Sequence, residues 1–105
     1  MYFNRRSFVA LKTDGTVVAW GDSNTGGTAP EGLINVLTVC SNSRAFAALR
    51  TDGTVVAWGD SAAGGTAPEG LTDVTKIYST KFAFAALKTD GTVVTWGSYK
   101  DNWDN

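Results

Sequence analysis

Short apolar runs along the chain are separated by segments rich in Gly, Thr and Asp. The runs at 45–49 and 55–58 are apolar at consecutive positions, whereas a strand with one solvated face alternates apolar and polar residues. Their Ala residues would let neighbouring sheets approach closely, and Phe and Trp would fill the wider space between them. The pattern therefore predicts short β-strands in sheets that are covered on both faces.

The pattern returns with a period of 38 residues. The segment Thr-Asp-Gly-Thr-Val-Val-Ala-Trp-Gly at 13–21 recurs at 51–59 and, with Thr95 in place of Ala, at 89–97. A fixed period of this kind is the signature of a repeat architecture. We therefore divide the chain into repeat 1 at 1–38, repeat 2 at 39–76, a truncated repeat 3 at 77–99 and a tail at 100–105.

An Asp-Gly pair separates two apolar runs within each repeat. The pairs are Asp14-Gly15, Asp52-Gly53 and Asp90-Gly91. Asp-Gly is a strong hairpin signal, because both residues tolerate the positive φ that a two-residue type I′ turn requires. We therefore interpret these residues as structural, although a recurring carboxylate could also serve as a metal ligand or a catalytic acid. The predicted strand pairs are 7–12 with 16–20, 45–50 with 54–58, and 83–88 with 92–96.

A shorter strand is predicted before each hairpin, at 36–40 and 74–78 for the second and third, and the chain is expected to open at the first such strand. The Gly-Gly-Thr-Ala-Pro spacers are expected to hold at most a brief fourth strand or an ordered loop. Each repeat is thus a small antiparallel meander, and sheets stacked face to face in a ring would cover both faces of its strands. The predicted fold class is all-β, with three β-propeller blades that form a partial ring or a ring completed by oligomerisation.

The repeated segment resembles a known family. The core aliphatic-x-x-Asp-Gly-x-aliphatic-x-x-Trp-Gly, present in 45–59 and its copies, is similar to the regulator of chromosome condensation repeat, a β-propeller family. The family's usual repeat is longer and often carries His before the first hairpin strand and a Gly-Gln-Leu-Gly spacer, so this chain resembles a compact, bacterial-style variant. No residue here matches the exchange activity or the chromatin contacts of the founding member.

Composition limits the chemistry of the 105 residues. Nine basic and ten acidic side chains leave a net charge of -1, without the excess of basic residues that is typical of a nucleic-acid-binding protein. The chain has no His and one Cys, Cys40, so the commonest general base is absent and no internal disulfide can form. No apolar run approaches the roughly 20 residues of a membrane span. We expect a protein that is not an enzyme, with no catalytic residue, cofactor or metal; nothing indicates its compartment.

Charged residues that differ among the repeats mark a candidate binding rim. Basic residues precede the first hairpin strand, and two acidic residues follow the Trp-Gly pairs; together they are Arg5, Arg6, Arg44, Lys81, Asp22 and Asp60. Because successive loops of a meander alternate ends, all six should lie on the rim opposite the Asp-Gly turns. An anionic glycan or an acidic protein surface would suit this rim, whereas the alternative is an ordinary solvated edge of mixed charge.

Trp20, Trp58 and Trp96 recur at one repeat position. We interpret them as packing residues between blades, the alternative being platforms on which sugars stack. The function predicted is a non-enzymatic repeat module for protein binding or assembly, alone or as a fragment of a larger propeller. The alternative is a carbohydrate-binding propeller, a lectin or an adhesin. Because a propeller needs roughly four to eight blades, three repeats should self-associate, and a homodimer with six blades is favoured.

Overall fold

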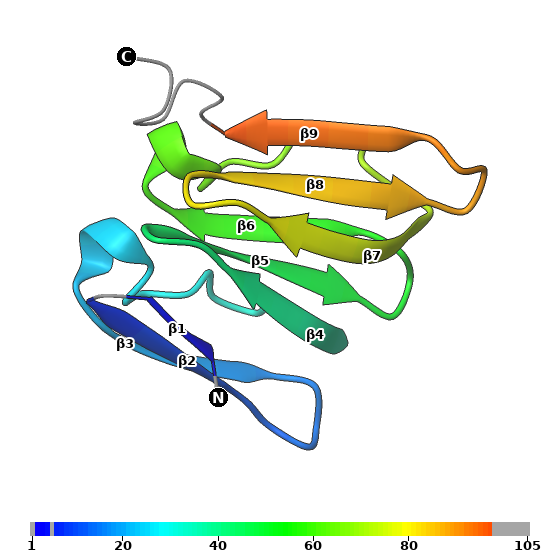
Figure 1. Ribbon diagram of the computed structural model, residues 1–105. Helices are drawn as coiled ribbons and strands as arrows, with labels where there is room; N and C mark the ends of the chain where they lie inside the picture. The colour runs from blue at the N-terminus through cyan, green and yellow to red at the C-terminus, as the bar shows by residue number, and fades with distance from the viewer. Residues whose placement is uncertain (1, 5, 98–105) are drawn as a thin grey trace, which may run out of the picture.

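The computed structural model describes residues 2–4 and 6–97 of the chain (Figure 1). Nine strands form three antiparallel sheets of three strands each, in the orders β1-β2-β3, β4-β5-β6 and β7-β8-β9. The strands are β1 (Tyr2–Phe3), β2 (Ser7–Leu11), β3 (Val17–Gly21), β4 (Val36–Ser41), β5 (Ala45–Arg50), β6 (Val55–Gly59), β7 (Val74–Ser79), β8 (Ala83–Lys88) and β9 (Val93–Gly97). The prediction of an all-β fold made of three meanders is confirmed.

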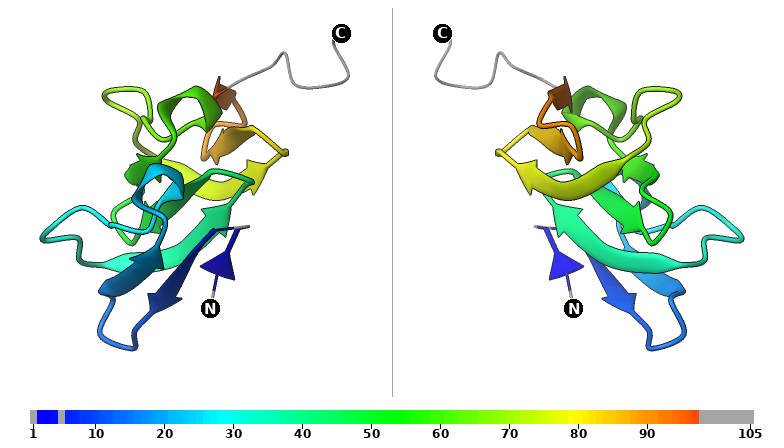
Figure 2. Two further views of the ribbon diagram at one scale, coloured as in Figure 1. Left: turned by 90° about the vertical axis from the view of Figure 1, so that its left-hand side faces the viewer. Right: turned by 90° about the vertical axis from the view of Figure 1, so that its right-hand side faces the viewer.

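Three units follow one another in chain order. Unit 1 is the sheet β1-β2-β3 with the spacer at 22–35, unit 2 is β4-β5-β6 with the spacer at 60–73, and unit 3 is β7-β8-β9. Unit 2 lies between units 1 and 3 in every view (Figures 1 and 2). Within the described residues each sheet pairs only its own strands. The units meet through side chains, loops and backbone bonds to turns, such as that from Val36 N–H to Gly15 O.

The Asp-Gly turns join the strands where expected, but they are of another type. After the last strand pair, Leu11 with Val17, Gly15 N–H donates to Lys12 O over 3.0 Å and Lys12 N–H donates to Thr16 O over 2.8 Å. The predicted positive φ of Asp14 is wrong, since only Gly15 in this turn has a positive φ, of 85°. The loop thus has three residues, a type I turn closed by a left-handed Gly.

The turn Asp instead accepts hydrogen bonds from the Thr that follows the Gly. The Oδ1 atom of Asp52 accepts from the Thr54 hydroxyl over 2.6 Å and from the Thr54 N–H over 3.0 Å. These bonds, above all the one from the hydroxyl, hold the pKa of the Asp52 carboxyl below its usual range. The same bonds and the same direction of pKa shift recur at Asp14 and Asp90.

Each described spacer is an ordered loop that opens with a 3-10 helix and contains no strand. The helices are η1 (Ser23–Thr25) and η2 (Ser61–Ala63). Asp22 caps η1, because its Oδ1 accepts from Asn24 N–H over 2.9 Å, and Asp60 caps η2 in the same way. A side-chain oxygen at this position satisfies one of the free N–H groups of the first turn. The Trp-Gly-Asp sequence therefore marks where a strand ends and a helical turn begins.

The core lies between the units, and both faces of the central sheet contribute to it. Five of the six residues of β5 are buried. Ala45, Ala47 and Leu49 pack with unit 3, whereas Phe46 and Ala48 pack with unit 1, as the period of two along a strand requires. The predicted two-sided burial is confirmed for unit 2, which has an alanine face toward unit 3 and an aromatic face toward unit 1.

Candidate functional site

The contact between consecutive units has the same form twice. The Trp58 indole Nε1–H of unit 2 donates to Gly26 O of unit 1 over 3.1 Å, and Trp96 of unit 3 donates to Gly64 O of unit 2 over 3.0 Å. Both Trp side chains are buried, being 5% and 6% exposed. Each glycine turn thus covers the aromatic face of the next unit, and its glycine carbonyl accepts the hydrogen bond of the buried indole there.

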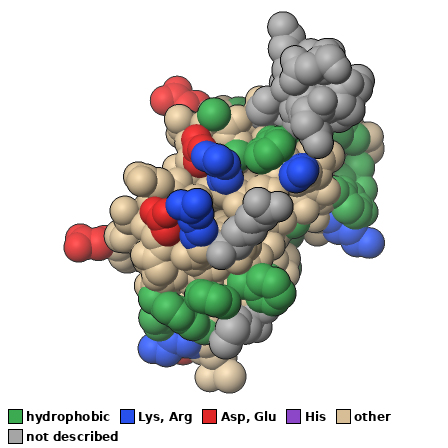
Figure 3. Space-filling model, turned by 60° about the vertical axis from the view of Figure 1, so that its left-hand side comes forward, with side chains coloured by type: hydrophobic (Ala, Val, Ile, Leu, Met, Phe, Trp, Pro, Cys, Tyr) green, Lys and Arg blue, Asp and Glu red, His purple; other side chains and the backbone are tan. Residues whose placement is uncertain are grey.

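Unit 1 presents the same aromatic face, and no other unit within residues 2–4 and 6–97 covers it. Phe8 is 38% exposed and Trp20 is 41% exposed, although their counterparts in units 2 and 3 are buried. Phe3 and Val18 extend the face and are also exposed. We call these four residues the aromatic face of unit 1. Hydrophobic side chains gather at this end of the molecule, the lower end in Figure 3.

The aromatic pair of unit 1 already has the geometry of the buried pairs. The ring centroids of Phe8 and Trp20 lie 5.6 Å apart with 20° between the planes. The centroids of Phe46 and Trp58 lie 5.8 Å apart at 26°. The exposed pair therefore needs no rearrangement to receive a glycine turn, which lowers the cost of binding one.

Unit 3 presents the opposite kind of face. The side of unit 3 that faces away from unit 2, here called the alanine face of unit 3, consists of Tyr78, Ala83, Ala85, Leu87 and Val93, the counterparts of unit 2 residues that pack on unit 3. Ala83 is buried, and Ala85 and Leu87 are half-buried. Tyr78 is 53% exposed and Val93 is 59% exposed. The two ends of the described chain thus carry the two complementary halves of one interface.

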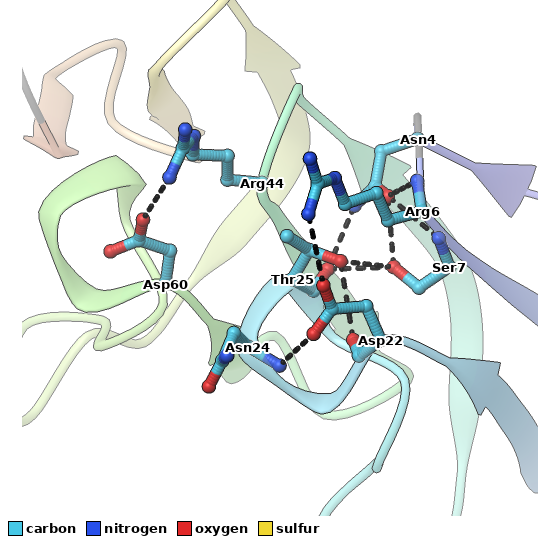
Figure 4. A network of polar contacts seen from close by, with 8 residues as sticks. All are labelled: Asn4, Arg6, Ser7, Asp22, Asn24, Thr25, Arg44 and Asp60. Atoms are coloured by element: carbon cyan, nitrogen blue, oxygen red, sulfur yellow. Dashed lines mark hydrogen bonds and ion pairs between the residues drawn. The ribbon is translucent and has the colours of Figure 1, made fainter.

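Four of the predicted rim residues, Arg6, Asp22, Arg44 and Asp60, lie near one another in two pairs (Figure 4). Arg6 Nη1 lies 3.6 Å from Asp22 Oδ2, and Arg44 Nη1 lies 3.2 Å from Asp60 Oδ2. Each acid therefore caps a 3-10 helix and pairs with the Arg of its own unit. Both pairs are exposed and contribute little to stability. Arg5 falls outside the described residues.

Lys81 differs from the two arginines of the rim. In the described part of the chain it has no carboxylate partner; its Nζ lies 5.8 Å from the centroid of the Phe82 ring, within cation-π range. A hollow of about 340 Å³ opens beside it, lined also by Arg6, Asp22 and Arg44. Arg6 and Arg44 are each paired with an Asp, so the positive charge of Lys81 is the one left unbalanced among the described lining residues, although the charge of the whole chain is -1.

Two asparagines, which were not predicted from the sequence, hydrogen-bond the loop before the hairpin to the 3-10 turn at this rim. Asn42 is buried; its Nδ2–H donates to Ala63 O over 2.7 Å, and its Oδ1 accepts from the N–H of Arg44 and of Ala45. Asn4 makes the equivalent bond to Thr25 O over 2.8 Å. The signal was present, since the two asparagines stand one period of 38 residues apart.

No resident metal or membrane helix is indicated in the parts of the chain that the structure describes. Residues 2–4 and 6–97 contain no group of three or more His, Cys, Asp or Glu side chains placed to hold a metal ion. None of their helices has the length and the apolar character needed to cross a bilayer. Cys40 is a free, half-buried thiol on β4.

Comparison with known proteins yields a shared fold. No protein-family model matches the sequence, and no curated protein is significantly similar to it. The structure is similar to that of the entire ectodomain of the receptor kinase CR4 from Physcomitrella patens, with a TM-score of 0.70 and 25% sequence identity over 90% of this chain. The chain spans 27% of that ectodomain chain. The likeness supports an all-β chain of repeated three-stranded sheets.

Proposed function

We propose that the chain is a non-enzymatic β-propeller module for assembly with other proteins, built from repeats of the regulator of chromosome condensation type. One observation carries the proposal: the aromatic face of unit 1 and the alanine face of unit 3 are the two halves of an interface that occurs twice inside the chain. Exposed apolar faces of this kind mark interaction sites.

The same step that relates unit 1 to unit 2 would place the unit 3 of one chain on the unit 1 of another. Such a contact is head to tail, and head-to-tail contacts form closed rings when the rotation per step divides a full turn. Two chains would supply six units, within the range of roughly four to eight blades that propellers use. We therefore propose self-association as a homodimer.

Light scattering and native mass spectrometry at low micromolar concentration test this proposal. The chain should form a species of twice its 11.1 kDa mass, and Trp20→Ser should remain monomeric because it removes the largest side chain of the aromatic face. Leu37→Ser is the matched control, since Leu37 is 59% exposed but belongs to neither open face. A wild-type chain that stays a cooperatively folded monomer would contradict the proposal.

The rim hollow favours a second candidate, the binding of an anionic glycan or of an acidic protein surface. Its support is the cation Lys81 without a carboxylate partner among the described residues, beside the aromatic ring of Phe82. Stacking of sugars on Trp58 or Trp96 has no such support, because both rings are buried between units. A glycan array tests the lectin form of this candidate: binding of acidic glycans that Lys81→Ala weakens supports it, and silence across the array counts against it.

A further inference from the structure

We infer that the aromatic face of unit 1 is a docking site for the glycine turn of another repeat unit, carried on a separate chain. A Gly-Gly pair in that turn raises the affinity of the partner for this face. The inference rests on the proposed assembly function and names the chemistry of the partner: a 3-10 turn that ends in Gly-Gly and offers the carbonyl of the first Gly.

The indole of Trp20 provides the polar half of this recognition. In units 2 and 3 the equivalent indole N–H donates to the carbonyl of a glycine in the preceding turn, Gly26 or Gly64. Among the described residues the Trp20 N–H donates no hydrogen bond. A partner whose turn repeats this geometry would give Trp20 the bond that Trp58 and Trp96 already make, and it would exclude water from the Phe8 ring.

Shape provides the second half, because only glycine fits against the aromatic pair. A Cβ on Gly64 would lie 2.7 Å from Cδ2 of Phe84, and a Cβ on Gly26 would overlap the ring of Phe46. Both glycines also have left-handed backbones, with φ of 107° at Gly26 and 95° at Gly64. Any other residue would therefore push the ring away as well as strain the turn.

The second glycine is required for a different reason. A Cβ on Gly65 would lie 2.5 Å from the carbonyl oxygen of Gly59, at the end of the preceding strand. The Gly59 carbonyl could move away only by disrupting the end of strand β6. The pair thus serves two purposes: the first Gly meets the partner's aromatic rings, and the second lets the turn fold back on its own unit.

A second copy of this chain meets only part of the requirement. Its unit 3 offers an alanine face, but the sequence has Asn102 and Trp103 one period after Gly64 and Gly65, in the segment outside the described residues. The complete partner is therefore a repeat unit that has Gly-Gly at this position, and a copy of the chain is the weaker partner. Self-association of the chain should become stronger when glycines replace Asn102 and Trp103.

The test gives the chain its own glycine turn. The residues of the 60–65 turn are placed one period later by the substitutions Ser98→Asp, Tyr99→Ser, Lys100→Ala, Asp101→Ala, Asn102→Gly and Trp103→Gly. Sedimentation velocity over a concentration series then compares the self-association of this grafted chain with that of the wild type. We expect the dissociation constant of the ring-shaped dimer to fall about a hundredfold, because each of its two contacts gains one further buried hydrogen bond of roughly 1 to 1.5 kcal/mol.

Two controls separate recognition from a general change of the tail. The same graft with Asn102→Ala in place of Asn102→Gly should gain nothing, because the added Cβ meets the Phe8 ring. Trp20→Phe in the grafted chain should lose most of the gain, since the ring stays but the donor is gone. Asn102→Gly with Trp103→Gly alone is the minimal variant and should show part of the gain even if the full graft folds poorly.

The outcomes distinguish the inference from the proposed function. If the wild type self-associates and neither glycine variant binds more tightly, the docking inference is wrong and the assembly function stands. If the wild type is a monomer and the graft is a dimer that needs Trp20, the inference is supported and the homodimer is wrong. If wild type and both glycine variants are all folded monomers, both ideas are contradicted.

Discussion

Two tryptophans at one repeat position provide a matched pair of substitutions, Trp58→Ala and Trp20→Ala. Trp58 is 5% exposed and its indole donates to Gly26 O over 3.1 Å. Trp20 is 41% exposed, and its pairing with Phe8 is otherwise that of Trp58 with Phe46. The two substitutions remove the same atoms from the same sheet position, so the difference in their cost isolates the contribution of the neighbouring unit.

The expected magnitudes follow from burial. Trp58→Ala leaves a cavity between units 1 and 2 and should lower the free energy of unfolding by about 3 to 5 kcal/mol. Trp20→Ala leaves no enclosed cavity, and the lost burial of a partly covered ring should cost about 1 to 2 kcal/mol. Trp58→Phe, which keeps a ring but leaves the Gly26 carbonyl without its donor, should cost about 1 to 3 kcal/mol.

Urea denaturation followed by circular dichroism measures these differences, at a protein concentration below that of self-association and with the m-value checked for each variant. Equal losses for the two Trp→Ala variants would refute the packing of Trp58 between units 1 and 2. A loss below about 1 kcal/mol for Trp58→Ala would mean that this ring is exposed in solution, and it would revive the interpretation of the ring as a sugar platform.

Three further changes test single contacts. Gly26→Ala should cost more stability than Gly32→Ala in urea denaturation, because a Cβ on Gly26 overlaps Phe46 whereas a Cβ on Gly32 meets nothing within 4 Å, and both glycines have positive φ. Asn42→Ala should cost about 1 to 3 kcal/mol by the same assay, because it leaves a buried carbonyl and two N–H groups without partners. The lowered pKa of Asp52 stabilises the fold at pH values above the unfolded pKa of about 3.9, and this contribution is lost as the pH falls through the folded pKa. Thr54→Val should therefore be less stable than the wild type at pH 6 and should approach it in stability near pH 2, as measured by thermal melts over a pH series.

The strands and their pairing could be predicted from local sequence, but the turn chemistry could not. Apolar runs on either side of Asp14-Gly15 predict an antiparallel hairpin whether the turn has two residues or three. Asp-Gly fits a two-residue type I′ turn and also a three-residue turn closed by glycine. The choice depends on backbone bonds of Lys12 with Gly15 and Thr16, which composition does not reveal.

The location of the candidate rim could be predicted from the sequence, but the ion pairs between its residues could not. The alternation of loop ends put Arg6 and Asp22 on one rim, but their ion pair depends on how the spacer folds back after β3. The capping role of Asp22 is likewise visible only once a 3-10 helix begins after it. Trp20 and Trp58 have identical local sequences, and they differ in exposure because only Trp58 lies under the glycine turn of a neighbouring unit.

The proposed head-to-tail assembly can be tested by mixing two chains that are each defective at one face. Trp20→Ala removes the centre of the aromatic face, and Val93→Asp places a charge on the alanine face, where Val93 is 59% exposed. Each variant alone should sediment as a monomer of about 11.1 kDa. An equimolar mixture should form a species of twice that mass, because one intact aromatic face meets one intact alanine face. A mixture that stays monomeric under conditions in which the wild type dimerises would contradict the head-to-tail contact.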